Sequence, residues 1–198
     1  EAEVDDHAGF LPGGQFADLL ARVRAGTWIR VDKLSYGFLS IDQFAPGEDL
    51  WLLASGTGLG PFVSILRDAA TWAAFRTVVV VHSVRHASEL AYHEEIATLP
   101  REDLTSIDPA RLKYVPVVTR ESCAGALNAR IPQLVESSRL ESAAGTSLDP
   151  QRSRVMVCGN PELGHVLRRQ LIARGFHVNR RATPGQLALE NYWQGPPS

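Results

Sequence analysis

Short apolar runs, many of them rich in β-branched residues, alternate with helical stretches from residue 50 onward. In chain order the runs are LWLLAS (50–55), TVVVVHSV (77–84), LKYVPVVT (112–119), RVMVCG (154–159) and FHVNRR (176–181). Runs that are apolar throughout are typical of strands buried on both faces, and helices between them indicate parallel connections. The pattern predicts an α/β fold, a five-stranded parallel sheet flanked by helices on both faces.

The helices that cover this sheet are expected between the strands, near residues 60–73, 87–98, 127–137 and 161–174. In parallel sheets of this kind, ligands bind at the carboxyl ends of the strands. Four strand ends should therefore point at one crevice, and they are residues 55–60, 82–88, 118–122 and 157–161.

The pattern before residue 49 differs from the rest. Residues 1–12 are acidic and irregular, FADLLARVRAG (16–26) predicts a short helix ended by Gly26, and TWIRVDKL (27–34) alternates like a half-buried strand. APGEDL (45–50) then interrupts the pattern. We expect two parts, residues 1–48 and residues 49–198.

Composition narrows the function classes. The 198 residues are 44% hydrophobic and carry a formal charge of −2, which gives no support to a nucleic-acid or membrane-surface partner. Two cysteines, Cys123 and Cys158, make neither a disulfide framework nor a zinc site, so no metal is expected. No run of about 18 apolar residues and no basic-then-apolar leader is visible, which predicts a cytoplasmic protein.

The first strand end carries a glycine-rich loop that fits neither common phosphate-binding motif. The loop consists of Gly56, Thr57, Gly58, Leu59, Gly60 and Pro61. A dinucleotide fingerprint would need glycine at position 61, and a P-loop would need a lysine. The glycines would let the main chain approach a ligand, Pro61 suits the first turn of a helix, and Thr57 with the helix amides would bind a pyrophosphate. The alternative is a tight strand-to-helix turn without a ligand.

Arginines mark the next two strand ends. Ser83 and Arg85 stand where an acidic residue would accept the ribose 2′-hydroxyl of NAD, and arginine there suits a 2′-phosphate, which favours NADP. Arg120 ends the third strand, and Arg130 lies on or just before the next helix. Each arginine taken alone is equally well explained as a solvated surface charge.

The fourth strand end is MVCGNPEL. Cys158 is expected to face the crevice, Gly159 allows close approach, and Pro161 opens the next helix. A lone buried cysteine is usually inert packing, and His165 is not placed as its base, so we expect a contact role rather than covalent catalysis. Near the terminus, Glu190, Tyr192 and Trp193 predict either an ordered last strand or a lid over a planar cofactor.

Five segments in order carry a resemblance to a known family: GTGLGPFVSIL, VHSVRHASELAYHEEI, YVPVVTRE, RVMVCGNPEL and ENYW. From about residue 14 to 193 the chain resembles the bacterial branch of the ferredoxin/flavodoxin–NADP⁺ reductases. That family joins an FAD-binding antiparallel barrel to an NADP-binding α/β domain. The resemblance implies that residues 49–198 are the NADP-binding domain and that residues 1–48 are the C-terminal remnant of the barrel.

The resemblance also implies a role for each candidate residue. The glycine loop, Gly56–Pro61, would line the pyrophosphate and the nicotinamide approach, with Gly159, Asn160 and Pro161 beside it. Arg85, Arg120 and Arg130, with Ser83, would take the 2′-phosphate. The catalytic set would be Cys158 beside the nicotinamide C4, Glu190 for orientation and proton supply, and Tyr192. Tyr192 would either stack on the flavin ring or guard the nicotinamide site, and Trp193 would extend that aromatic cover.

The implied activity is hydride exchange between NADPH and FAD, followed by single-electron steps with ferredoxin or flavodoxin. The chain is expected to act as a monomer. Two alternatives stay open, an NAD(P)H-flavin reductase or oxygenase reductase component and a non-catalytic NADP-binding fragment.

The barrel part departs from the family pattern. The family's R-x-Y-[ST] signature is not found, and Ala17 stands where the family usually has Ser or Thr. The chain is therefore expected to be either part of a longer reductase or a reductase without the full barrel. The resemblance thus implies NADP and FAD as cofactors and leaves open whether this chain retains FAD.

Overall fold

The computed structural model describes residues 18–19, 21–28, 30, 39–102, 111–180 and 183–191, with side chains described except at 100–102 and 191. The chain divides into two compact units, residues 1–37 and residues 38–198. In the first unit Asp18 and Leu19 are helical, but residues 21–22 already form a turn, so the helix expected over 16–26 stops well before Gly26. The strand expected over 27–34 lies largely outside the described residues.

The second unit is built on a five-stranded parallel sheet with the strand order β3-β2-β1-β4-β5. The strands are β1 (Asp49–Ser55), β2 (Thr77–Val84), β3 (Leu112–Val118), β4 (Ser153–Gly159) and β5 (Leu187–Asn191). Strands β1 and β2, in the interior of the sheet, are buried almost throughout. The predicted five-stranded parallel sheet is confirmed.

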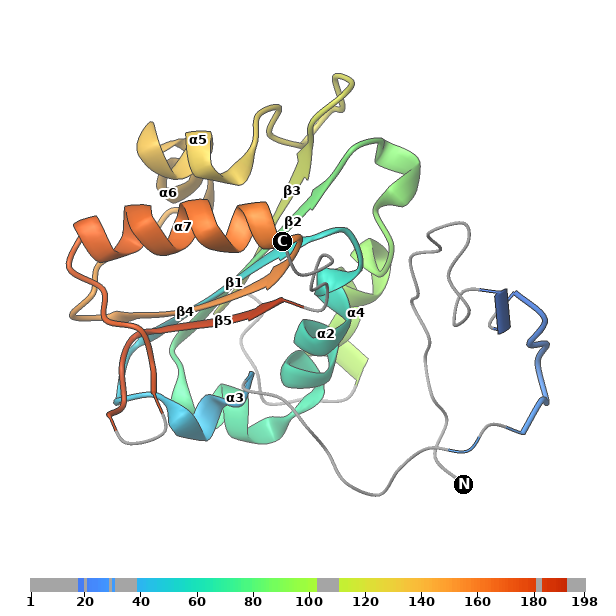
Figure 1. Ribbon diagram of the computed structural model, residues 1–198, viewed down its shortest axis with the longest axis horizontal. Helices are drawn as coiled ribbons and strands as arrows, with labels where there is room; N and C mark the ends of the chain where they lie inside the picture. Colours follow the sequence, from blue (N-terminus) through green and yellow to red (C-terminus); the bar gives the residue numbers. More distant parts are fainter. Residues whose placement is uncertain are drawn as a thin grey trace, which may run out of the picture. The chain divides into compact units, whose positions relative to one another are not determined.

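Helices cover both faces of this sheet (Figure 1). One face carries α2 (Gly60–Arg67), α3 (Ala69–Ala74) and α4 (His93–Glu102), and the other carries α5 (Ile131–Glu136), α6 (Arg139–Ala144) and α7 (Pro161–Ala173). Successive strand residues point to opposite faces. Leu50 and Leu52 accordingly pack in the core under α2–α4, and Trp51 and Leu53 pack in the core under α5–α7.

The fifth strand is not where the hydrophobic pattern placed it. Of the expected strand, residues 176–180 are described, and they form only isolated bridges at Val178 and Arg180; β5 is Leu187–Asn191, which pairs with β4. Phe176 is buried in the core, and the segment after it bonds to the chain just before and at the start of β5, with the His177 carbonyl accepting the main-chain N–H of Gln186 (2.9 Å). Phe176 therefore reflects core packing beyond the end of α7 rather than a strand.

The helix near 161–174 is confirmed, and the other three begin or end elsewhere. The stretch 60–73 is split at Asp68, whose side chain accepts the Ala70 N–H (2.9 Å) and starts α3. A single 3₁₀ turn, η3 (Ala87–Glu89), precedes α4. The start of α5 is delayed to Ile131, because Leu127 is still bonded alongside β3. Helix α6 was not anticipated.

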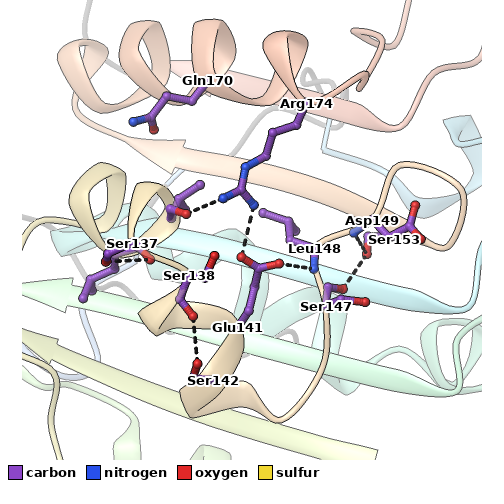
Figure 2. A network of polar contacts seen from close by, with 12 residues as sticks. Ser137, Ser138, Glu141, Ser142, Ser147, Leu148, Asp149, Ser153, Gln170 and Arg174 are labelled. Carbon is purple, nitrogen blue, oxygen red and sulfur yellow. Dashed lines mark hydrogen bonds and ion pairs between the residues drawn. The ribbon is translucent and has the colours of Figure 1, made fainter.

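A polar network ties the end of α7 to the α5–α6 layer (Figure 2). Arg174, one residue beyond α7, places its guanidinium 3.1 Å from the Glu141 carboxylate and donates to the Val135 carbonyl. The same carboxylate accepts the Leu148 N–H (2.9 Å), and Gln170 donates to the Pro132 carbonyl in the first turn of α5 (3.2 Å). These contacts fix α5 against α7.

None of the helices in the described part of the chain combines the length and apolarity that crossing a membrane requires.

Candidate functional site

The carboxyl ends of the strands bring the predicted site residues to one edge of the sheet. From β3 to β5, this edge carries Arg120, Arg85, the glycine loop, Cys158 and Glu190. The glycine loop therefore lies in the middle, with arginines on one side and the cysteine and glutamate on the other. We call this edge the rim.

The glycine loop forms a 3₁₀ turn, η2 (Gly56–Leu59), that runs directly into α2. Gly56 has a φ of +54°, and both Gly56 and Thr57 are exposed at the rim. Pro61 lies in the first turn of α2, as predicted. The Leu59 side chain is fully buried in the core, so only its main chain is available to a ligand.

A buried histidine on β2 contacts the main chain of this loop. His82, on β2, is fully buried, and its Nε2 lies 3.2 Å from the Gly56 carbonyl oxygen. A carbonyl only accepts a hydrogen bond, so Nε2 carries the proton in this contact. This role was not predicted from the sequence, although a histidine within the apolar run TVVVVHSV indicates that a polar group lies opposite.

Two glycines let the glycine loop and the end of β4 interlock. A Cβ on Gly58 would lie 2.4 Å from the Cys158 carbonyl oxygen, and one on Gly159 would lie 2.0 Å from the Ser55 hydroxyl. That hydroxyl accepts the main-chain N–H of Asn160 (3.1 Å). The missing side chain of Gly58 thus makes room for the protein itself, where the sequence suggested room for a ligand.

The start of α7 is fixed by its own cap. The Asn160 side-chain oxygen accepts the Leu163 N–H (2.8 Å), and Pro161 is the first residue of the helix, as predicted. The exposed Asn160 and the main chain of Gly159 stand beside the glycine loop at the rim.

Cys158 and Glu190 are brought together by the register of β4 and β5, in which they are direct partners. Both lie on the sheet face that carries α2–α4, where Cys158 is fully buried and Glu190 is half-buried. This pairing places a thiol and a carboxylate at the same end of the rim. Tyr192 and Trp193 lie outside the described residues.

The arginines occupy the other part of the rim. Arg120 donates its main-chain N–H to the Arg85 carbonyl (3.0 Å), so these two exposed residues are neighbours. Ser83 lies half-buried in register with Ser55 of β1. Arg130 precedes α5 and lies 3.9 Å from the Glu162 carboxylate at the start of α7. The structure therefore joins Arg85 to Arg120 directly and sets Arg130 beside α7.

Carboxylates, which the sequence analysis did not single out, fix the turn after Arg85. Glu89 Oε2 accepts the main-chain N–H groups of Arg85 (2.8 Å) and His86 (2.9 Å). The pKa of the Glu89 carboxyl is lowered, chiefly by the hydrogen bond from the His86 main chain. Glu121 Oε1 accepts the next N–H, that of Ala87 (2.6 Å). The turn that presents Arg85 is thus held at three successive N–H groups.

The chain is similar to named reductases over most of its length. A family profile described as an oxidoreductase NAD-binding domain matches residues 52–169. A flavodoxin/ferredoxin–NADP reductase of Shigella flexneri is 36% identical over 185 residues, which is 92% of this chain and 72% of that protein. Ferredoxin–NADP reductase A of Sorangium cellulosum is 38% identical over 93% of this chain and 67% of that protein.

A solved structure shares the fold at similar identity. It is the crystal structure of a ferredoxin NADP⁺ reductase from Neisseria gonorrhoeae with bound FAD and NADP, with a TM-score of 0.83 and 34% identity. The match covers 93% of this chain and 72% of that chain.

Proposed function

Because the chain belongs to the ferredoxin/flavodoxin–NADP reductase family, we propose that it exchanges electrons between NADPH and ferredoxin or flavodoxin by way of FAD. The observation that carries this proposal is the rim, which sets a glycine loop between two adjacent arginines and a cysteine–glutamate pair. Residues 49–198 would be the NADP-binding domain and residues 1–48 the end of the FAD-binding barrel. Leu39, Ile41 and Phe44 pack against the core of the sheet unit, so the compact part begins before residue 49.

The exposed part of the glycine loop suits the pyrophosphate of NADP. Gly56 and Thr57 are exposed at the amino end of a turn that continues into α2. Main-chain N–H groups at such an end carry partial positive charge and attract phosphate. Ser55, which precedes the turn, does not cap it and instead accepts from Asn160. The loop therefore binds through its main chain, with His82 and Ser55 keeping its shape.

The arginine side of the rim suits the 2′-phosphate. Guanidinium groups bind phosphate oxygens with paired hydrogen bonds, and a charge-assisted bond contributes about 1.5–3 kcal/mol. Arg85 and Arg120 present such groups from neighbouring loops, Arg130 would add a third from the position just before α5, and Ser83 lies near the end of β2. NADH lacks the 2′-phosphate, so these contacts set the preference for NADPH.

The cysteine–glutamate side would receive the nicotinamide. FAD, when bound, accepts the hydride of NADPH and passes electrons on singly. Cys158 would lie against the nicotinamide as an uncharged contact, and Glu190, its partner across the strands, would orient the ring and move protons. Tyr192 and Trp193 would provide the aromatic cover. The segment proposed to hold FAD lies mostly outside the described residues, so FAD is proposed here from family membership.

The deciding experiment is an anaerobic titration of the full chain, reconstituted with FAD, while the flavin absorption is recorded. NADPH should bleach the flavin bands, and oxidised flavodoxin or ferredoxin should restore them. Binding of NADPH without any change in the flavin spectrum would contradict the reductase function and support a nucleotide-binding module instead.

A further inference from the structure

We propose that Glu121 is a positioning residue that holds the three arginine-bearing loops together and thereby sets the preference for NADPH over NADH. The proposal rests on the function proposed above, in which Arg85, Arg120 and Arg130 take the 2′-phosphate. Glu121 follows Arg120 directly and touches both other loops through its side chain or its main chain.

The first link joins the loops of Arg85 and Arg120. The Glu121 side chain accepts the Ala87 N–H at 2.6 Å, which pins the turn two residues beyond Arg85. Behind it, the Thr119 main-chain N–H and hydroxyl both donate to the Val84 carbonyl at 3.0 Å. The Glu121 bond lies farthest along the two loops, where the regular pairing of β2 and β3 has ended. It therefore ties the exposed turn to the loop of Arg120, whereas the two bonds to Glu89 act within the turn itself.

The second link joins the loops of Arg120 and Arg130. The Asn128 side-chain amide donates to the Glu121 carbonyl (2.7 Å) and to the Val118 carbonyl (2.9 Å). Arg130 follows two residues later and is fixed by Gln133, whose side chain accepts its main-chain N–H (3.1 Å). A displacement of residue 121 would thus be transmitted to the segment that carries the third arginine.

The charge of Glu121 and its position act on the phosphate in opposite directions. A carboxylate near a 2′-phosphate repels it, and this side chain is 44% exposed, with the His86 ring 3.8 Å away. If repulsion alone mattered, every substitution that removes the charge would strengthen the binding of NADPH. If positioning alone mattered, every substitution that removes the hydrogen bond to Ala87 would weaken the binding of NADPH. Substitutions that remove one property and keep the other separate the two effects.

Three variants of the full chain provide this separation. Glu121→Gln removes the charge and keeps an acceptor, Glu121→Asp keeps the charge and shortens the reach, and Glu121→Ala removes both. The measurements are kcat and KM with NADPH and with NADH, and the dissociation constants of adenosine 2′,5′-bisphosphate and 5′-AMP. We expect Ala and Asp to raise the NADPH KM and the bisphosphate dissociation constant about 5- to 10-fold, corresponding to one lost hydrogen bond. The kcat, the KM for NADH and the dissociation constant of 5′-AMP should change little. The Glu121→Gln variant should bind NADPH at least as well as the unmodified chain.

Two controls identify what has failed if these results do not appear. Glu136→Ala removes a carboxylate from an exposed position on α5 and should leave the KM values for NADPH and NADH unchanged. Arg85→Ala tests the proposed function itself, and an unchanged NADPH:NADH ratio in that variant would refute the 2′-phosphate assignment. If Arg85→Ala lowers the ratio while Glu121→Ala and Glu121→Asp leave it unchanged or raise it, the positioning role of Glu121 is overturned. The Asp variant decides the matter should the Ala variant not fold.

Discussion

The three glycines of the loop at residues 56–60 serve different physical purposes. Gly56 has a positive φ of +54°, a conformation that side chains other than glycine rarely adopt. Gly58 has an ordinary backbone but no room, because the Cys158–Gly159 peptide packs against its Cα. Gly60 has free space, since a Cβ there would meet no atom within 4 Å apart from its chain neighbours, but it adopts the αR conformation directly before Pro61, which a residue with a Cβ disfavours. The same residue type therefore reflects a positive φ at Gly56, packing at Gly58 and, at Gly60, the proline that follows.

Gly58→Ala should therefore lose more stability than Gly60→Ala. The Cβ on Gly58 would lie 2.4 Å from a main-chain oxygen, so the end of β4 must move, at a cost of about 1–3 kcal/mol. Gly60→Ala, in the first turn of α2, should cost less, because only the local preference of the residue before Pro61 opposes the new Cβ and alanine itself favours the helix. Urea unfolding of the two variants measures the difference. Equal midpoints would show that the loop and the end of β4 are not interlocked.

Single residues also show where prediction from the sequence reaches its limit. Arg85, Arg120 and Cys158 could be placed at one edge because the ends of parallel strands meet there, whatever the details of the fold. Glu89 and Glu121 could not be connected with the turn they hold, since their bonds depend on loop geometry. The packing role of Gly58 was hidden for the same reason, because its partner is 100 residues away in the chain.

At the scale of helices and strands, burial decides which elements can be read from the pattern. Strands β1, β2 and β4, in the centre of the sheet, are apolar on both faces and were predicted almost to the residue. The edge strand β5 mixes core and rim positions, with Leu187 buried and Glu190 only half-buried, so its pattern is less distinct. The break at Asp68 was not predicted, although aspartate is a common helix cap, and the short α6 depends on contacts made by Glu141 across the layer.

The α5–α6–α7 layer should depend on the pair formed by Arg174 and Glu141. Their side chains are 29% and 19% exposed, and the Arg174 guanidinium also donates to the Val135 carbonyl. Arg174→Met removes charge-assisted hydrogen bonds and should cost about 2 kcal/mol of unfolding free energy. For a chain of this size that corresponds to a drop in Tm of about 4–8 °C.

Arg139→Met provides the matched control for this layer. Arg139 is exposed on α6, and the loss of an exposed charge usually changes stability by less than about 0.5 kcal/mol. Calorimetry of both variants compares them under identical conditions. If the two melting temperatures coincide, the network in Figure 2 does not stabilise the layer.

At the scale of the whole sheet unit, the strand order places the arginines and the cysteine–glutamate pair at opposite ends of the rim. The arginines lie at the ends of β2 and β3, and Cys158 and Glu190 lie at the ends of β4 and β5, with β1 and its glycine loop between the two groups. A nucleotide bound along the rim would place its phosphorylated ribose at one end and its nicotinamide at the other. Recognition and chemistry are then carried by different loops that share one rigid sheet.

This division predicts that substitutions at the two ends act independently. Three strand spacings separate β3 from β4, so their ends, which carry Arg120 and Cys158, lie about 14 Å apart across the sheet. Arg120→Ala should raise the KM for NADPH, because it removes a phosphate contact. Cys158→Ser should slow the reduction of the flavin, because it changes the surface against which the nicotinamide lies.

A double-mutant cycle on kcat/KM with NADPH measures the independence directly. Sites this far apart without shared partners usually add within about 0.5 kcal/mol, so the double variant should show the product of the two single effects. Thermal unfolding of each variant checks that the buried Cys158 site has kept its fold. A coupling well above that value would mean that the two ends of the rim move together when NADPH binds, and the separation of recognition from chemistry would have to be given up.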